Sequence, residues 1–140
     1  MREILFRAKR LYDGEWIEGL LCKKKYNRNK LFISYFPNED DEEECFAVDP
    51  ETVGQFTGLT DKNGVKIFEG DIVSTDIERP YLIVGFRDGC FMFNCNDGGE
   101  DYYDIMLPIL NKPQTQYKYG EVIGNIFDNP ELLKGGGTDE

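Results

Sequence analysis

The stretch QFTGLTDKNGVKIFEGDIVST, from Gln55 to Thr75, is the most tightly specified part of the sequence. Its centre, DKNG at residues 61–64, suits a tight turn, because an Asp side chain accepts hydrogen bonds from the turn backbone and Gly tolerates a left-handed conformation. The short β-type segments QFTGL and VKIF flank this turn, and EG at residues 69–70 marks a second corner before DIVST. The pattern predicts a hairpin that leads through a sharp corner into a new strand.

Further β-type segments lie on both sides of this hairpin. EILFRAK at residues 3–9, EWIEGLLCK at 15–23 and LFISYF at 31–36 predict an N-terminal β-meander, because the connections between them are short and rich in turn residues. YLIVGF, CFMFNC and EVIGNIF follow in the second half. Several short strands separated by turns predict a mainly β protein, either a small SH3-like barrel or a coiled antiparallel sheet.

The end of the chain is typical of a short helical turn. In FDNPELLK, at residues 127–134, Pro130 fits the first position of a helix, and GGGTDE then ends it. We therefore expect an N-terminal β subdomain at residues 1–50, with an acidic loop at 38–44. A barrel-like C-terminal subdomain is expected at residues 51–134, followed by a disordered tail at 135–140.

The composition is that of a soluble globular protein. A chain of 140 residues with 40% hydrophobic and 14% aromatic residues is long enough to bury a core. Its charged start, MRE, and its short apolar runs predict neither a signal peptide nor a membrane-spanning helix. The 4 cysteines are irregularly spaced, so we expect reduced thiols in a cytoplasm.

The formal charge of −11 is unevenly distributed. Residues 1–37 hold 9 Lys or Arg against 4 Asp or Glu, whereas residues 38–140 hold 7 basic and 23 acidic residues. Most of the surface should therefore repel nucleic acid. The basic segment KKKYNRNK at residues 23–30 is interpreted first as a solvated hairpin loop and second as a local binding face. The candidate partner surface in it comprises Lys23, Lys24, Lys25, Arg28 and Lys30.

Two acidic regions offer alternatives for binding. NEDDEEE at residues 38–44 contains six consecutive acids, which are typical of a mobile surface loop, and the Gly-bearing spacing of a calcium loop is missing. Further along, Tyr102 and Tyr103 lie among Glu100, Asp101 and Asp104. This mixture either lines a partner surface for a basic or polar molecule or covers the open end of a barrel.

The sequence contains no histidine. This absence removes the usual general base near neutral pH and every Ser-His or Cys-His nucleophile. The best remaining candidates for acid-base chemistry are the carboxylates of Glu69 and Asp71 around Gly70. We favour a structural interpretation, in which these polar groups accept hydrogen bonds from backbone amides at the corner.

The cysteine pattern is not that of a zinc site. Cys22 and Cys45 stand alone, and Cys90 and Cys95 are five positions apart, which places their side chains on opposite faces of a regular strand. We therefore interpret the cysteines as buried or edge thiols, and we expect neither a metal nor a cofactor.

Three blocks of the sequence resemble the YopX family, small proteins encoded mainly by bacteriophages and prophages. The blocks are ILFRAKR at residues 4–10, DPETVGQFTGLTDKNGVKIFEGDIV at 49–73 and VIGNIFDNPELL at 122–133. The resemblance implies a β-rich, barrel-like fold and residence in a bacterial cytoplasm. It implies no activity and assigns no catalytic or binding residues. We expect these blocks to hold the fold through Gly58, Asp61, Asn63, Gly64, Glu69, Gly70, Asp71, Gly124, Asn125 and Pro130.

The function that these observations favour is a non-enzymatic binding or interaction module, because no catalytic constellation accompanies the charged loops. An acidic decoy that imitates nucleic acid is the alternative. A hydrolase based on Glu69 and Asp71 and a nucleic-acid binder based on the basic segment are less favoured. A protein partner is expected rather than nucleic acid or membrane, and exposed strand edges are compatible with a homo-oligomer.

Overall fold

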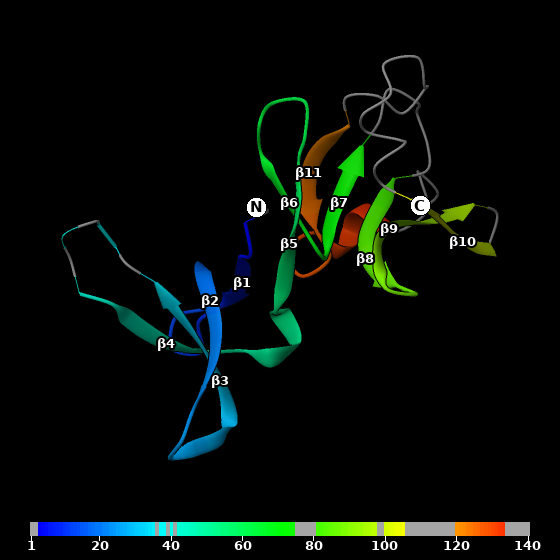
Figure 1. The fold of residues 1–140 in the computed structure, drawn as a ribbon. Helices are drawn as coiled ribbons and strands as arrows, with labels where there is room; N and C mark the ends of the chain where they lie inside the picture. Colours follow the sequence, from blue (N-terminus) through cyan, green and yellow to red (C-terminus); the bar gives the residue numbers. More distant parts are fainter. Residues whose placement is uncertain are drawn as a thin grey trace. The chain divides into compact units, whose positions relative to one another are not determined.

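The computed structural model describes residues 3–35, 37–38, 40, 42–74, 81–97, 100–105 and 120–133, with only the backbone described at 95–97 and 100–105. The chain forms two compact units, residues 1–58 and residues 59–140, which are called the N-terminal unit and the C-terminal unit below. Antiparallel strands make up most of the described residues, as the sequence predicts (Figure 1). Helical structure among the described residues is confined to two short 3₁₀ turns.

The N-terminal unit is a coiled antiparallel sheet. Consecutive strands pair in the order β4-β3-β2-β1, and β1 also pairs with β5, which confirms the N-terminal meander. The 3₁₀ turn η1 at Pro50–Thr52 connects β4 to β5. The strands of this unit are β1 Phe6–Lys9, β2 Trp16–Lys24, β3 Asn27–Tyr35, β4 Glu44–Val48 and β5 Gly54–Thr60, which runs past the division between the units.

One face of this sheet is buried because apolar residues recur at every second position. Ala8, Ile17, Ile33 and Val48 form the core of the unit. Strand β2 comes very close to β3 at Gly19, where an added Cβ would lie 2.2 Å from the carbonyl oxygen of Ser34. The lack of a side chain at Gly19 therefore permits the tight coiling of these two strands.

The N-terminal sheet curls back on itself without closing. A single bridge between Arg10 and Val48 brings the end of β4 to the end of β1. The amide of Leu11 donates to the carbonyl of Ala47 at 3.0 Å beside this bridge. The described strands form no closed barrel, so the coiled sheet is the version of the predicted fold that the structure shows.

The C-terminal unit contains the second sheet, whose strand order is β10-β9-β8-β7-β11. Strand β11 pairs with β7 instead of its sequence neighbour β10, and the buried core comprises Ile67, Val73, Leu82, Val84 and Phe93. The predicted C-terminal helical turn is a 3₁₀ turn, η2, at Pro130–Leu133. The strands of this sheet are β7 Asp71–Ser74, β8 Leu82–Arg87, β9 Cys90–Asp97, β10 Glu100–Ile105 and β11 Glu121–Asn125. Strand β6 Lys66–Phe68 pairs with β5 at the edge of the first sheet.

Candidate functional site

The turn between β5 and β6 is held by the side chain of Asp61. Its Oδ1 atom accepts hydrogen bonds from the amides of Asn63 and Val65, at 2.8 and 2.9 Å. Its Oδ2 atom accepts one from the amide of Val122 in β11, at 2.9 Å. Burial by itself raises the pKa of Asp61, but these hydrogen bonds stabilise the carboxylate, and its pKa lies below the ordinary value. Asp61 is therefore a structural anchor that connects the turn to β11.

The two glycines of this hairpin have backbone conformations that other residues rarely adopt. Gly58 has a φ of 89° and Gly64 a φ of 81°. The amide of Gly64 donates to the carbonyl of Asp61 at 3.0 Å and closes the turn. The positive φ values account for glycine at these two positions, and no ligand is needed to explain them.

The corner between β6 and β7 is also structural. Asp71 is 1% exposed, and its Oδ2 atom accepts a hydrogen bond from the amide of Phe68 at 2.8 Å. Gly70 has a φ of 90°. Its amide donates a hydrogen bond to the carbonyl of Val84, and its carbonyl accepts one from the amide of Ile126. The buried Asp71 thus accepts a backbone hydrogen bond at the corner, while Glu69 is half-buried. This arrangement supports the structural interpretation of Asp71, and the interpretation of Glu69 stays a prediction.

The segment after β11 folds around two asparagines. The Oδ1 atom of Asn125 accepts hydrogen bonds from the amides of Phe127 and Asp128, at 3.0 and 2.9 Å. The Oδ1 atom of Asn129 accepts one from the amide of Asn125 at 3.1 Å and lies 2.5 Å from where a Cβ on Gly124 would be. Sequence reasoning identified Gly124 and Asn125 but missed this role of Asn129.

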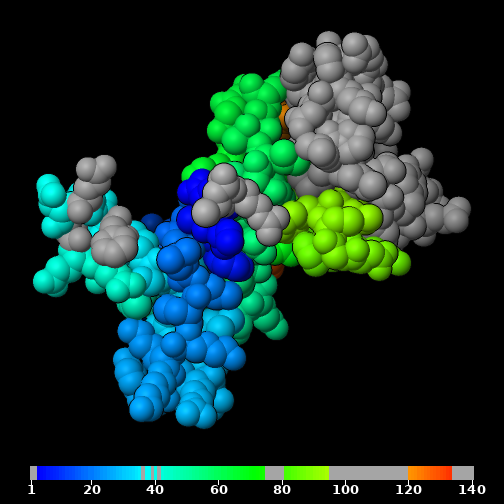
Figure 2. Space-filling model, viewed as in Figure 1, coloured from blue at the N-terminus to red at the C-terminus, as the bar shows by residue number. Residues whose placement is uncertain are grey.

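The hydrogen bonds of Asp61, Asp71 and Asn125 thus serve the fold, and the candidate interaction surface lies in the N-terminal unit. The basic segment is a strand hairpin with a short turn, because β2 extends to Lys24 and β3 begins at Asn27. The hairpin stands away from the rest of this unit (Figure 2). Tyr26, at its turn, is 83% exposed. We call this region the basic tip; its exposed cations are Lys23, Lys25, Arg28 and Lys30.

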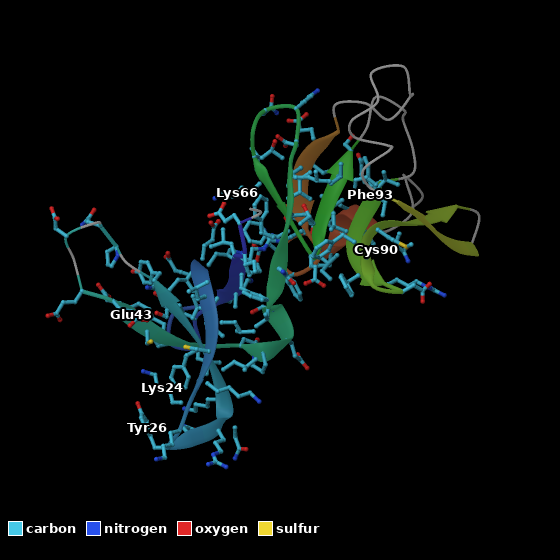
Figure 3. All side chains as sticks on the ribbon, in the orientation of Figure 1. Lys24, Tyr26, Glu43, Lys66, Cys90 and Phe93 are labelled. Atoms are coloured by element: carbon cyan, nitrogen blue, oxygen red, sulfur yellow. The ribbon has the colours of Figure 1, made fainter. Side chains whose placement is uncertain are left out.

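The remaining cation of the segment, Lys24, lies on the side of the sheet opposite the core. Figure 3 shows Lys24 close to Tyr26 in the hairpin. The Nζ atom of Lys24 is 5.4 Å from the centre of the Phe32 ring. Lys24 is therefore held over an aromatic ring, while its neighbours in the basic tip are exposed.

The side of the N-terminal sheet opposite the core, which we call the outer face, continues this pattern. The Arg7 guanidinium and the Lys9 amine lie 4.8 and 5.4 Å from the ring centre of Trp16. Lys9 and Trp16 are directly opposite each other in β1 and β2. Leu20 is 57% exposed in β2, at a position that alternation assigns to the same face. Sequence reasoning missed this face, although the even spacing of Arg7 and Lys9 around the buried Ala8 could have indicated it.

Two free thiols also lie on the outer face. Alternation along β2 and β4 places Cys22 and Cys45 opposite the core, and both are half-buried. Burial raises the pKa of the Cys22 thiol, as do the charge and hydrogen bonding of Cys45. The pKa of Lys24 is raised in turn by its hydrogen bond with Cys45. Sequence reasoning treated Cys22 and Cys45 as isolated, and the fold instead places both on the outer face.

The cysteines and carboxylates in the described ranges form no candidate metal site. No cluster of three or more Cys, Asp and Glu side chains that could hold a metal ion occurs there. The thiol of Cys90 donates a hydrogen bond to the carbonyl of Arg87 at 3.6 Å. The side chains of Cys95, Tyr102 and Tyr103 lie outside the described atoms, so the predictions that concern them stay predictions.

The acidic loop connects β3 to β4, at the end of β3 away from the basic tip. Asp40, Glu42, Glu43 and Glu44 are exposed. The Ser34 hydroxyl donates a hydrogen bond to the Glu43 carboxylate, which lies in the connection shown in Figure 3. The N-terminal unit therefore carries exposed cations at one end of β3 and exposed carboxylates at the other.

Comparisons with known proteins agree with the resemblance in the sequence. The family model described as YopX protein matches residues 5–134. A crystal structure of protein EF1440 from Enterococcus faecalis is similar, with a TM-score of 0.53 and 26% sequence identity over 96% of this chain and 100% of that chain. No curated protein matches. No helix in the described part of the chain is long and apolar enough to cross a membrane. Because the family model spans nearly all of the sequence, the chain belongs to the YopX family.

Proposed function

We propose that this protein is a non-enzymatic binding module whose N-terminal unit binds an acidic protein partner. The observation that carries the proposal is the outer face, where the cations of Arg7 and Lys9 flank the Trp16 ring and Lys24 lies over Phe32. The basic tip extends this surface with four exposed cations and the exposed ring of Tyr26. We place this activity in a bacterial cytoplasm, in keeping with a phage or prophage origin.

The residue types of this surface are those that dominate protein interfaces. Trp, Tyr and Arg supply much of the binding energy of such interfaces, because large rings bury area and guanidinium groups bind carboxylates in a fixed geometry. Exposed cations at the edge of the surface increase the rate of association with an acidic partner. An extended basic–aromatic surface therefore supports recognition of an acidic segment.

The charge of the rest of the chain favours a protein over nucleic acid. Residues 38–140 hold 23 acidic against 7 basic residues. A long, uniformly charged duplex is repelled by this net negative charge, which offsets the attraction of the basic tip. A short acidic peptide segment carries fewer charges than a duplex and is repelled less by this net negative charge.

Binding of defined polyanions tests this proposal. Fluorescent poly-glutamate and a DNA duplex are titrated separately with the protein at physiological ionic strength. We expect poly-glutamate to bind and the quadruple variant K23E/K25E/R28E/K30E to bind at least about tenfold more weakly, because the attraction becomes repulsion. The matched control is Arg87→Glu, which reverses an exposed charge in the C-terminal unit and should leave binding unchanged. Equal binding of the duplex would instead identify a nucleic-acid binder.

A second candidate function is an acidic decoy of a nucleic-acid-binding host protein. It is supported by the exposure of Asp40, Glu42, Glu43 and Glu44 in the acidic loop. A decoy should compete with DNA for its target, and the competition should weaken as salt is added. Neutralising the six acids at residues 39–44 should abolish the competition, and an unchanged interaction would rule out this candidate.

A further inference from the structure

The outer face of β2, β3 and β4 carries a band of apolar side chains. Two neighbouring rows of directly paired residues cross these three strands, and residues in such pairs share a face. Ile33, which lies between the rows in β3, belongs to the core on the opposite face. Leu20 is 57% exposed, and the other members except Ser34 are half-buried. The rows are Leu20, Ser34 and Cys45, and Cys22, Phe32 and Ala47; their five apolar members, with Cys counted as a small hydrophobe, are called the apolar band.

Charges of opposite sign lie at the two ends of this band. The basic tip lies beyond the row that contains Phe32, and the acidic loop lies beyond the row that contains Ser34, whose hydroxyl donates to Glu43. Figure 3 shows Lys24 and Tyr26 at the one end and Glu43 at the other. The outer face thus has an apolar centre between a cationic end and an anionic end, and protein interfaces likewise combine an apolar centre with a polar rim.

The two charged ends of one copy are too far apart to pair with each other. Strand β3 separates them, and its length from Asn27 to Tyr35 is roughly 25 Å, at about 3.3 Å per residue. An ion pair needs a nitrogen and an oxygen within about 4 Å of each other. The ion pairs between described residues involve no exposed charge of the basic tip or the acidic loop. Both ends are therefore open to a second molecule.

We propose that the apolar band is the centre of a two-fold homodimer, in which the basic tip of each copy contacts the acidic loop of the other. When two copies meet face to face with antiparallel β3 strands, the apolar bands cover each other and both charged contacts form at once. A two-fold axis makes such an interface self-complementary, because the same surface of each copy takes part. The inference rests on the proposed function, since it identifies the acidic partner of the N-terminal unit as the acidic loop of a second copy.

The net charge of the chain is compatible with this contact. Each copy carries a formal charge of −11, but charges in water at physiological ionic strength are screened beyond about 8 Å. Opposite charges in direct contact lie within that distance. The local complementarity of tip and loop therefore outweighs the repulsion between distant charges of the two copies.

An exchange of charges between two variants tests the homodimer. The tip variant K23E/K25E/R28E/K30E places acids against acids, and the loop variant D40K/E42K/E44K places cations against cations. In sedimentation velocity at physiological ionic strength, we expect the wild type to dimerise in the micromolar range and each variant alone to dimerise at least about tenfold more weakly. An equimolar mixture of the two variants should form a heterodimer, because each tip then meets a loop of opposite charge. This recovery would also show that both variants are folded.

Two controls separate the contact from net charge and from the apolar band. The loop variant changes the formal charge by +6, from −11 to −5, so general repulsion falls while the dimer should still weaken. Leu20→Gln removes apolar area and leaves the basic tip intact. It should therefore weaken the dimer and preserve the binding of poly-glutamate.

The outcomes distinguish the homodimer from the proposed function. A wild-type chain that stays monomeric but binds poly-glutamate overturns the homodimer alone, and a chain that does neither overturns the binding function as well. A dimer that survives both charge reversals, or a mixture of the variants that stays monomeric, overturns the contact between tip and loop. Oligomers larger than a dimer overturn the two-fold arrangement.

Discussion

Asp61 and Val122 are 61 positions apart in the sequence, and the amide of Val122 donates a hydrogen bond of 2.9 Å to the carboxylate of Asp61. The same carboxylate closes the turn between β5 and β6 through Asn63 and Val65. One buried side chain therefore links a local turn to a distant strand, and several consequences can be measured.

Replacing Asp61 by Asn should destabilise the protein in a pH-dependent way. The pKa of Asp61 is lower in the folded protein than its ordinary value of 3.8, so its stabilisation is fully present above pH 3.8 and is lost as the pH falls through the folded pKa. At neutral pH we expect the free energy of unfolding to fall by about 1–3 kcal/mol, because the amides of Asn63, Val65 and Val122 lose a charged hydrogen-bond acceptor. Urea unfolding across acidic pH measures this.

The control for that measurement is Asp88→Asn, at an exposed turn position. It should leave the unfolding free energy nearly unchanged, and its pH profile should follow the wild type. The Asp61→Asn profile should be flatter than the wild-type profile at acidic pH. Parallel profiles would contradict the role assigned to Asp61.

Gly19→Ala should be strongly destabilising. The added Cβ would lie 2.2 Å from the carbonyl oxygen of Ser34, and this contact can be relieved only by a shift of the paired backbone of β2 or β3. We expect a loss of at least about 1–3 kcal/mol, the usual cost of overpacking, in thermal or urea unfolding. Gly85→Ala is the matched control, because Gly85 is also in a strand and nothing lies within 4 Å of its added Cβ. If both substitutions lowered the free energy of unfolding equally, the effect would come from replacing a glycine in a strand and not from the close contact at Gly19.

Gly124 and Asn129 should behave as a coupled pair. A Cβ on Gly124 would lie 2.5 Å from the Oδ1 atom of Asn129, so Gly124→Ala must displace the side chain that accepts from the amide of Asn125. Asn129→Ala removes both the obstacle and the acceptor. The double variant should therefore cost less than the sum of the single variants, by about 0.5 kcal/mol or more in a double-mutant cycle of unfolding free energies. Additive costs would contradict the contact.

Trp16 should report binding at the outer face. It is the only Trp in the chain, and two cations lie against its ring, so the intrinsic fluorescence of the protein comes largely from this surface. Adding poly-glutamate should change the emission, because carboxylates draw Arg7 and Lys9 from the ring. Lys62→Gln, in the C-terminal unit, should leave the response intact, whereas an unchanged emission on saturating binding would place the contact elsewhere.

The local structure of the central motif could be predicted well from the sequence. Gly64 and Gly70 have the left-handed conformations that their turn positions suggest, and Asp61 accepts the expected backbone hydrogen bonds. The positive φ of Gly58, within β5, was not predicted. The short, turn-rich connections between β-type segments identified the strands of the meander. These features depend on residues that are close in sequence, so their cause is visible in a short segment.

The contacts that make up the candidate surface could not be predicted in the same way. The basic segment was interpreted as a loop, yet β2 and β3 extend into it because their ladder continues to the pair Lys24 and Asn27. Closure into a barrel depends on how sheet edges meet, and alternation within a strand carries no information about that.

Turn chemistry and residue alternation act over a few positions, so the β-rich class and the turns and corners of the central motif could be predicted from the sequence. The three sequence blocks likewise indicated the YopX family. Tertiary structure alone decided that β11 pairs with β7, that the sheets stay open, and which side chains gather on the outer face. Those outcomes depend on register, twist and coiling accumulated over several strands. A glycine at position 19 permits the close approach of β2 and β3, but only the folded sheet shows what that approach brings together.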